Sequence, residues 1–204
     1  MALLKHPYHG HTDERLMELI VDKDQRAFEI LYERYGKLMY NYFHRMLWKD
    51  KEKSRDFTQE LFTKIIHKPH LFDPERSFKT WIYSVANNMC KNEYAKHDVR
   101  KVAHEDIKRG DSFTSGNDAQ RNMDRDQFNE KLQEALNGLD ETKRTTFELR
   151  FRQEMSIIEI SEVMQCSEGT VKSRLFYTLK DLNQKLKVFE GILLWIISLI
   201  IHQP

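Results

Sequence analysis

Apolar residues recur at every third or fourth position along most of this chain, which is the period of an amphipathic α-helix. The pattern is clearest near the C-terminal end, where it covers Ile157–Met164 and again Val171–Leu186. Cys166 and Ser167 interrupt the repeat between these two stretches. The pattern therefore predicts two helices that meet at a tight turn.

Polar residues mark where each of these helices begins. Ser156 and Glu159 have the S-x-x-E spacing of a capping box, and Ser167 is a good N-cap for the second helix. The outer face of the second helix is polar and basic. It carries Thr170, Lys172, Ser173, Arg174, Tyr177 and Lys180. Residues 168–187 contain five Lys or Arg and two acidic residues, which is a local charge of +3.

A short helix, a tight turn and a second helix with a basic outer face are typical of a helix-turn-helix. In that motif the second helix enters the DNA major groove, where its first residues reach base edges and its cations neutralise phosphates. An ordinary helical hairpin with a solvated basic face has the same pattern. Both interpretations stay open on this segment alone.

The same period predicts a series of helices before this motif. One begins at Asp13 behind a Thr12 cap, and a longer one begins at about Asp24 and carries an aromatic stripe. A third covers Arg55–Pro69, and a long fourth follows an N-cap at Ser77. No long alternating strand pattern occurs in the sequence, and Gly (7) and Pro (4) are scarce. The predicted fold class is therefore all-α.

Residues 101–124 have the composition of a linker, with few large apolar side chains and many Asp, Ser, Gly and Asn residues. After it, one helix is predicted to end at Gly138 and the next to begin behind an Asp140 cap. We therefore expect two small helical domains joined by a flexible linker. The first comprises residues 12–100 and the second, with the helix-turn-helix, residues 125–187. Residues 188–204 are left as an apolar tail.

The helix predicted over Arg55–Pro69 has two different faces. Its apolar residues, Ile66 among them, are expected to face the core. Four polar residues share the outer face at spacings of three or four: Asp56, Gln59, Glu60 and Thr63. Such a patch is often only solvated, and it can also dock a basic partner.

The long helix after Ser77 carries aromatic, amide and basic side chains together. The candidates for a nucleic-acid contact are Lys79, Trp81, Tyr83, Asn87, Asn88 and Lys91. Residues 79–101 contain five Lys or Arg and two acidic residues, again +3. Aromatic rings can stack on unpaired bases while cations hold the phosphates. Trp81 can equally belong to the core.

Composition limits the chemistry that we expect. The 33 basic and 32 acidic residues leave a net charge of +1, so any nucleic-acid footprint must be local. Two cysteines at apolar helical or turn positions, Cys90 and Cys166, suit a reducing cytoplasm and do not form a zinc set. The sequence has no Gly-rich phosphate loop, metal-ligand spacing, Ser-His-Asp arrangement or signal-peptide h-region. We expect no catalytic residue, metal, cofactor or small-molecule substrate.

Three motifs, taken in order, resemble a known family. DFTQELF, then SFKTWIYSVANNMCKNEY and later SEGTVKSRL are similar to segments of extracytoplasmic-function (ECF) sigma factors of bacterial RNA polymerase. The resemblance runs from about Asp13 to Leu186. It implies two helical domains on a tether. The first binds the clamp coiled coil of the polymerase and opens the minus-10 promoter element, and the second reads the minus-35 element. The implied partners are core RNA polymerase, promoter DNA and an anti-sigma factor, in the cytoplasm.

The resemblance also implies a role for each candidate surface. Asp56, Gln59 and Glu60, with Thr63 on the same face, match the polymerase-docking helix. Trp81 and Tyr83, with Lys79, Asn87, Asn88 and Lys91, match the melting and minus-10 face. Thr170, Lys172, Ser173 and Arg174, with Tyr177 and Lys180 on the same helix, match the minus-35 recognition helix.

Two positions depart from the family pattern. The turn usually has Gly where this chain has Gln165, which would carry a steric cost if the position needs a positive φ. Phe176 and Tyr177 stand where His or Arg is usual. Fewer phosphate contacts would weaken the salt-dependent part of DNA binding. The minus-35 sequence that the helix recognises can also differ. Two other classes of function stay open: a conventional helix-turn-helix regulator that binds operator DNA, and a helical adaptor that binds acidic proteins.

The resemblance does not explain the C-terminal tail, VFEGILLWIISLIIHQP. Ile192–Ile201 contains one polar residue, Ser198, and a run of ten cannot span a bilayer, which needs about 20 residues. Three fates stay open: packing into a groove between the two domains, binding a partner such as a membrane-bound anti-sigma factor, or peripheral membrane attachment through residues 188–204. We expect the tail to be regulatory and dispensable for promoter recognition.

Overall fold

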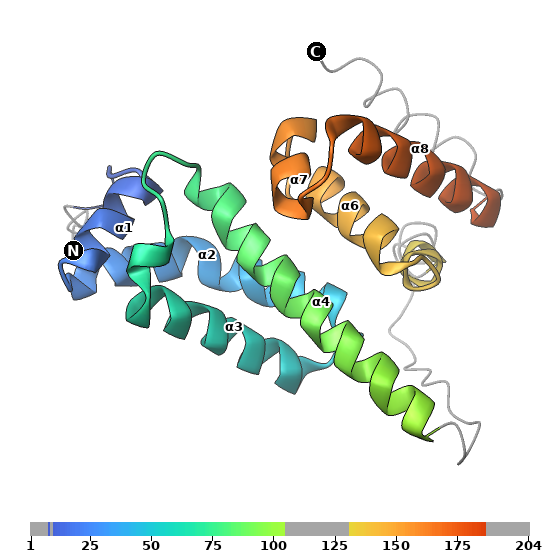
Figure 1. Ribbon diagram of the computed structural model, residues 1–204, viewed down its shortest axis with the longest axis horizontal. Helices are drawn as coiled ribbons and strands as arrows, with labels where there is room; N and C mark the ends of the chain where they lie inside the picture. Colours follow the sequence, from blue (N-terminus) through green and yellow to red (C-terminus); the bar gives the residue numbers. More distant parts are fainter. Residues whose placement is uncertain (1–7, 9, 105–130, 187–204) are drawn as a thin grey trace, which may run out of the picture. The chain divides into compact units, whose positions relative to one another are not determined.

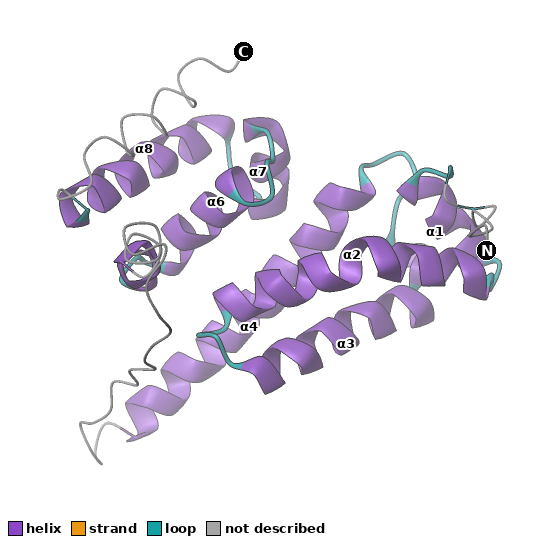
Figure 2. Cartoon of the chain, turned by 180° about the vertical axis from the view of Figure 1, so that it is seen from behind, coloured by secondary structure: helices purple, strands orange, loops and turns teal. Residues whose placement is uncertain are grey.

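The computed structural model describes residues 8, 10–104 and 131–186, and for 98–104 the backbone alone. All regular elements in these ranges are helices, which confirms the predicted all-α class (Figure 2). The chain divides into two compact units. One contains the residues up to Lys96 together with Ile158–Cys166, and the other contains His97–Ile157 and the residues from Ser167 onward. Residues 105–124 of the predicted linker and the tail at 188–204 lie outside the described ranges.

Most of the first unit is built from four α-helices and a short 3-10 helix, η1 (Figure 1). They are α1 (Asp13–Val21), α2 (Gln25–Met46), α3 (Lys51–His67), η1 (Pro69–Leu71) and α4 (Phe78–His104). The predicted cap at Thr12 is confirmed, because its side chain accepts the backbone N–H of Arg15. Asp24, at the predicted start of the second helix, caps α2 by accepting the backbone N–H groups of Arg26 and Ala27.

Helix α3 begins four residues before the predicted start. The Asp50 side chain accepts the backbone N–H of Lys53 and so caps a first turn that has no apolar residue. The apolar period could not reveal this turn, because the period first appears in the next one. Further along α3, Ile66 is 47% exposed, so the prediction that it faces the core is wrong.

Aromatic side chains fill the space where α4 meets α2. The Tyr83 ring of α4 lies edge-on to the Tyr42 ring of α2, with centroids 5.4 Å apart, and both residues are buried. The start of α4 is held by α1, since the backbone N–H of Phe78 donates to the Glu14 carboxylate over 2.9 Å. An ion pair of 2.6 Å between Lys53 and Glu93 ties the middle of α4 to α3. These contacts fix which side of α4 faces solvent.

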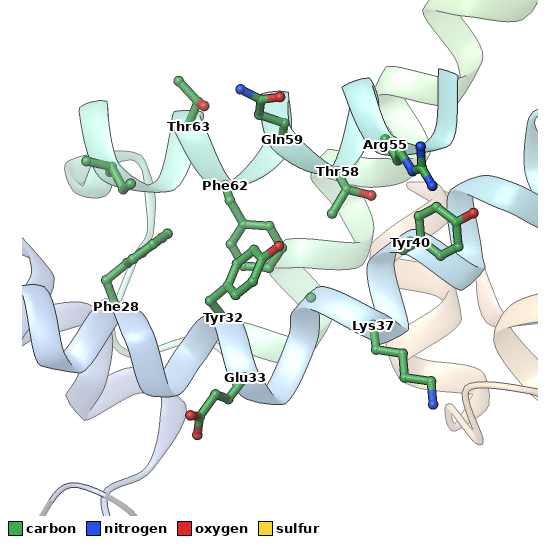
Figure 3. Close-up of a pocket in the computed structure, with 12 residues that line it drawn as sticks. Phe28, Tyr32, Glu33, Lys37, Tyr40, Arg55, Thr58, Gln59, Phe62 and Thr63 are labelled. Atoms are coloured by element: carbon green, nitrogen blue, oxygen red, sulfur yellow. The ribbon is translucent and has the colours of Figure 1, made fainter. Parts of the chain in front are cut away.

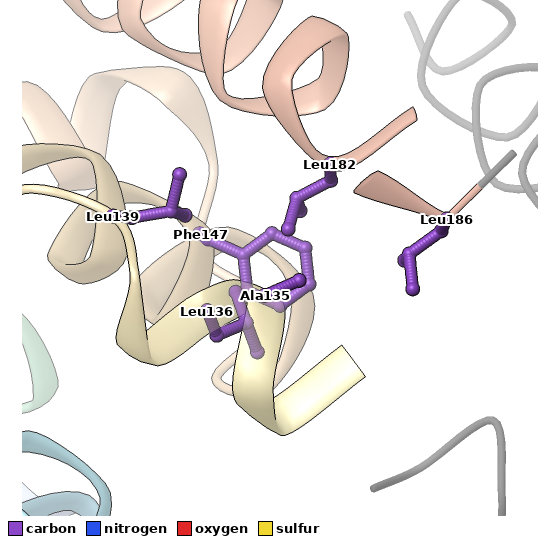
Figure 4. Packing of buried hydrophobic residues seen from close by; sticks show 6 residues of the cluster. All are labelled: Ala135, Leu136, Leu139, Phe147, Leu182 and Leu186. Atoms are coloured by element: carbon purple, nitrogen blue, oxygen red, sulfur yellow. The ribbon is translucent and has the colours of Figure 1, made fainter. Parts of the chain in front are cut away.

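The second unit is centred on α6 (Glu141–Phe151) and α8 (Glu168–Lys185), which pack against each other. Its core combines these helices with helical residues 131–137 (Figure 4). The buried members are Ala135, Leu136, Leu139, Phe147, Leu182 and Leu186. Lys143 of α6 and Asp181 of α8 form an ion pair of 2.8 Å, and the hydrogen bond from Lys143 to Asp181 raises the pKa of Lys143. The predicted Asp140 cap is confirmed.

Helix α7 (Ile157–Met164) is joined to α8 by three residues, as the sequence predicted. Ile160, Val163 and Met164 are the buried residues of α7. Among the described residues, no helix is both long and apolar enough to cross a membrane.

Candidate functional site

A groove of about 740 Å³ opens between α2 and α3, on the part of the first unit that the sequence marked as a docking face (Figure 3). Aromatic rings line it. The Tyr32 ring of α2 lies edge-on to the Phe62 ring of α3 at 4.7 Å, and the Phe28 ring is 6.1 Å from each. Tyr32 and Ile66 are about half exposed, at 49% and 47%, so apolar surface faces water here.

Gly36 of α2 makes room for the Tyr32 ring. A Cβ atom at position 36 would lie 3.3 Å from the end of that ring, closer than most Cβ contacts. Lys37 and Arg55 lie at the same end of the groove, together with Tyr40. The groove is thus aromatic along its length and basic at one end.

The four residues predicted to bind the polymerase lie on the exposed side of α3, beside this groove. Gln59 and Thr63 line it, whereas Asp56 and Glu60 are exposed on α3 without lining it. The Glu60 carboxylate forms an ion pair of 2.7 Å with Lys64 one turn later, and its side chain is 55% exposed. The structure therefore brings an acidic strip and an apolar groove together, a combination that the sequence did not predict.

The turn between α7 and α8 has the backbone that the family pattern indicated. Gln165 has a φ of 52°, in the left-handed region that favours glycine. Its successor Cys166 donates its backbone N–H to the Ser161 carbonyl over 3.0 Å, which closes the end of α7. Ser167 then caps α8 by accepting the backbone N–H of Thr170 over 3.2 Å, as predicted. The expected steric cost at position 165 is therefore present.

The predicted recognition helix presents one continuous outer face. At roughly 100° per residue, five of the six predicted residues fall within about 120° of the circumference of α8. They are Thr170, Ser173, Arg174, Tyr177 and Lys180. Lys172 lies outside this arc, about 80° beyond Lys180 on the helix circumference and next to the exposed Phe176. The opposite side of the helix is buried, with Val171, Leu175 and Leu179 in the core.

Two neighbouring aromatic side chains on this helix are largely exposed to solvent. Phe176 is 65% exposed and Tyr177 is 54% exposed, with ring centroids 5.4 Å apart. Thr170 is already engaged, because its hydroxyl lies 2.9 Å from the Ser167 hydroxyl in the helix cap. Ser173 and Tyr177 are exposed on the same face, and Arg174 is partly exposed.

Two of the residues predicted for the minus-10 contact lie in the core instead. Tyr83 is 1% exposed and Asn87 is 0% exposed. Tyr83 is two residues from Trp81, a step that turns a helix by about 200° and sends the two side chains to opposite sides. The expectation that Tyr83 and Asn87 lie on an accessible nucleic-acid face is corrected, and the Tyr83 ring packs against Tyr42. The Asn87 amide has no hydrogen-bond partner among the described residues.

The solvent-facing side of α4 carries three of the remaining candidates. Asn88 is exposed, and Trp81 and Lys91 are partly exposed on the same side. Asn92, which the sequence reading missed, is also exposed there, four residues after Asn88. Helical period alone could have found it. Lys79 is partly exposed near the start of the helix.

Trp81 divides its surface between core and solvent. Its ring lies 5.3 Å from the Phe72 ring and 5.7 Å from the Phe78 ring, and the residue is half-buried. One part of the indole therefore packs on the core while another part can meet a ligand. Within the described ranges, no three His, Cys, Asp or Glu side chains gather in an arrangement that could hold a metal ion.

Comparison with protein families finds two matches in this chain. Residues 31–100 match the model described as Sigma-70 region 2, and residues 129–182 match Sigma-70, region 4. The first match contains α3 and most of α4, and the second contains the helix-turn-helix.

Two similar curated proteins share 30% identity with the chain. RNA polymerase sigma-H factor of Pseudomonas aeruginosa matches over 183 residues, covering 86% of this chain and 94% of that protein. ECF RNA polymerase sigma-E factor of Haemophilus influenzae matches over 186 residues, covering 86% and 96%.

Two solved structures share the fold. CnrH, solved in complex with the cytosolic domain of CnrY, has a TM-score of 0.61 at 21% identity and covers 87% of this chain and 98% of its own. The sigma factor RpoE of Bartonella quintana, solved with the anti-sigma factor NepR, has a TM-score of 0.62 at 19% identity, covering 79% and 98%.

Proposed function

The chain belongs to the extracytoplasmic-function sigma factors of bacterial RNA polymerase, and from this premise we propose a role in transcription initiation for each of its exposed surfaces. A sigma factor binds core RNA polymerase and directs initiation at specific promoters. The observation that carries this function is the presence of both sigma regions, in order, in one chain. A conventional helix-turn-helix regulator is not favoured, because it has no counterpart of region 2.

The surface proposed to dock the polymerase is the exposed side of α3 with the adjoining groove. Asp56 and Glu60 supply negative charge for a basic partner, and Gln59 and Thr63 supply hydrogen bonds. Tyr32 and Phe62 in the groove supply apolar contact. Interfaces of this composition have an aromatic centre that carries most of the affinity, and a charged rim that sets orientation and association rate.

The outer face of α8 is proposed to read the minus-35 element in the major groove. Arg174 has the fork of donors that suits the O6 and N7 atoms of guanine. Lys172 and Lys180 suit phosphates, which position the helix without reading sequence. Tyr177 replaces a usual cation of the family, so we expect a weaker dependence of binding on salt at this position.

The solvent-facing side of α4 is proposed to contact the minus-10 element and hold it open. Trp81 offers the free part of its indole for stacking on an unpaired base. Asn88, Lys91 and Asn92 continue the same side with amide and basic groups. Tyr83 and Asn87 are buried and do not belong to this surface.

We assign no catalytic step to this chain, since sigma factors act as initiation factors and the polymerase carries the chemistry. We place the protein in the cytoplasm, where the polymerase works, with an anti-sigma factor as a further partner. The RpoE structure similar to this chain was solved with such a factor.

Promoter melting in a reconstituted holoenzyme tests the three assignments together. Purified chain and core polymerase should co-elute, and permanganate should then modify thymines around the minus-10 element of a responsive promoter. Co-elution without any opened thymine on any promoter would contradict the role given to α4.

A further inference from the structure

Two aromatic side chains in the middle of α8 face solvent. Phe176 has the largest exposed fraction of any large apolar side chain among the described residues, and Tyr177 is more than half exposed. Their rings lie edge-on to each other, with centroids 5.4 Å apart. Neither residue belongs to the buried core of the second unit. Packing among the described residues therefore does not account for these two rings.

Two lysines flank Phe176 on the same row of the helix. Lys172 precedes it by one turn and Lys180 follows it by one turn, so each lies about 40° from Phe176 on the circumference. Both lysines are exposed. The two acidic residues of α8, Glu168 and Asp181, fall outside this row. The row therefore places an aromatic ring between two cations, which is complementary to a polyanion and would repel a basic protein surface.

The major groove limits what such a ring can contact. If the two lysines bind phosphates, the ring between them faces the edges of the bases. Those edges carry hydrogen-bond donors and acceptors, and the apolar group among them is the C5-methyl of thymine. A phenylalanine ring cannot satisfy a donor or acceptor that it buries, whereas it gains free energy by burying a methyl group.

We propose that Phe176 and Tyr177 are specificity-determining residues that recognise thymine methyl groups in the minus-35 element. This inference rests on the proposed DNA-reading function of α8. Adjacent base pairs are about 3.4 Å apart along the duplex, so ring centroids 5.4 Å apart correspond to contacts one or two base steps from each other. The preferred element should therefore contain one or two thymines, on either strand, within three neighbouring base pairs.

Replacing thymine with deoxyuridine tests this recognition, because it removes the methyl group and keeps every hydrogen-bonding group of the base edge. Promoter fragments with a randomised minus-35 region are first selected with the reconstituted holoenzyme. The selected fragment is then remade with deoxyuridine at each thymine in turn, and its affinity for the holoenzyme is measured. Loss of one recognised methyl should weaken binding about fourfold, and loss of two about 15-fold.

Variants of the two aromatic residues connect this effect to α8. In the double variant Phe176→Ala with Tyr177→Ala, deoxyuridine should bind as well as thymine at every position. Both residues are exposed, so thermal unfolding should stay close to that of the wild type. Phe176→Leu keeps an apolar side chain and should retain most of the methyl effect. Lys180→Ala is the matched control on the same row: it should weaken binding to both fragments by the same factor and leave their ratio unchanged.

The possible outcomes separate this inference from the function on which it rests. Equal wild-type affinity for thymine and deoxyuridine at every position, or an unchanged ratio in the double variant, would overturn the inference and leave α8 as the DNA-binding helix. Weaker binding of the double variant to core polymerase without DNA would also overturn it, because the rings would then belong to a protein interface. A holoenzyme that selects no minus-35 sequence would instead refute the proposed function of α8.

Discussion

Reversing the charge of Glu60 should affect polymerase binding much more than the stability of the fold. The side chain is 55% exposed, and its ion pair with Lys64 spans one turn of α3. Exposed pairs of this kind contribute about 0.3–0.5 kcal/mol, and a like-charge pair at the same spacing costs a similar amount. Glu60→Lys should therefore lower the free energy of unfolding by less than about 1 kcal/mol, since no core residue changes.

The effect on polymerase binding should be much larger. If Glu60 faces a basic surface, the substitution places like charges against each other, which costs several kcal/mol at an interface. A loss of about 2 kcal/mol or more corresponds to at least roughly 30-fold weaker binding, because about 1.4 kcal/mol is a factor of ten. Titration of labelled protein with core polymerase, monitored by fluorescence anisotropy, measures this loss.

Glu18→Lys is the matched control for this experiment. Glu18 pairs with Arg15 on an exposed face of α1, and its side chain is 44% exposed. The control therefore makes the same chemical change at a similar site in the same unit, away from α3. Wild-type affinity in Glu60→Lys, or an equal loss in Glu18→Lys, would refute the assignment of α3 as the docking helix.

Three further substitutions test the other surfaces. Arg174→Ala should weaken binding to minus-35 DNA by about 1–3 kcal/mol, and by less on scrambled duplexes; an equal loss on both would make Arg174 a phosphate contact. Trp81→Ala should cost less stability than the roughly 3–5 kcal/mol of a fully buried Trp, because part of its ring is exposed, and should also slow promoter opening. Thermal unfolding and permanganate footprinting measure the two effects, and normal opening would leave Trp81 with a core role alone. Gln165→Gly should stabilise by roughly 0.5–1 kcal/mol in thermal unfolding, because relief of about 1–2 kcal/mol of left-handed strain exceeds the chain entropy that Gly adds. Gln165→Ala keeps the strain, so an equal gain there would contradict this account.

Local signals in the sequence predicted the helices well, because each depends on residues close together in the chain. The caps at Thr12, Asp24, Asp140 and Ser167 lie where an acceptor side chain precedes an apolar repeat, and all four accept a backbone N–H in the structure. The positive φ at Gln165 was indicated by the family pattern, which usually has Gly at this position.

The groove could not be predicted in this way. It forms where Tyr32 and Phe62, 30 positions apart, meet across two packed helices, and sequence spacing carries no information on that contact. The exposure of Ile66 has the same origin, because Ile66 lines the groove rather than the core. The error at Tyr83 and Asn87 was of another kind. Residue type suggested a nucleic-acid contact, but their position around α4 sends both side chains into the core.

Transcription from a defined promoter tests the central claim most directly. Core RNA polymerase without any other sigma factor is mixed with the purified chain and a library of promoter fragments, and run-off transcripts are sequenced. We predict specific initiation, with start sites that share minus-35 and minus-10 elements, and no such transcripts from core polymerase alone. A chain that binds duplex DNA by itself but leaves core polymerase inactive on every fragment would contradict the account.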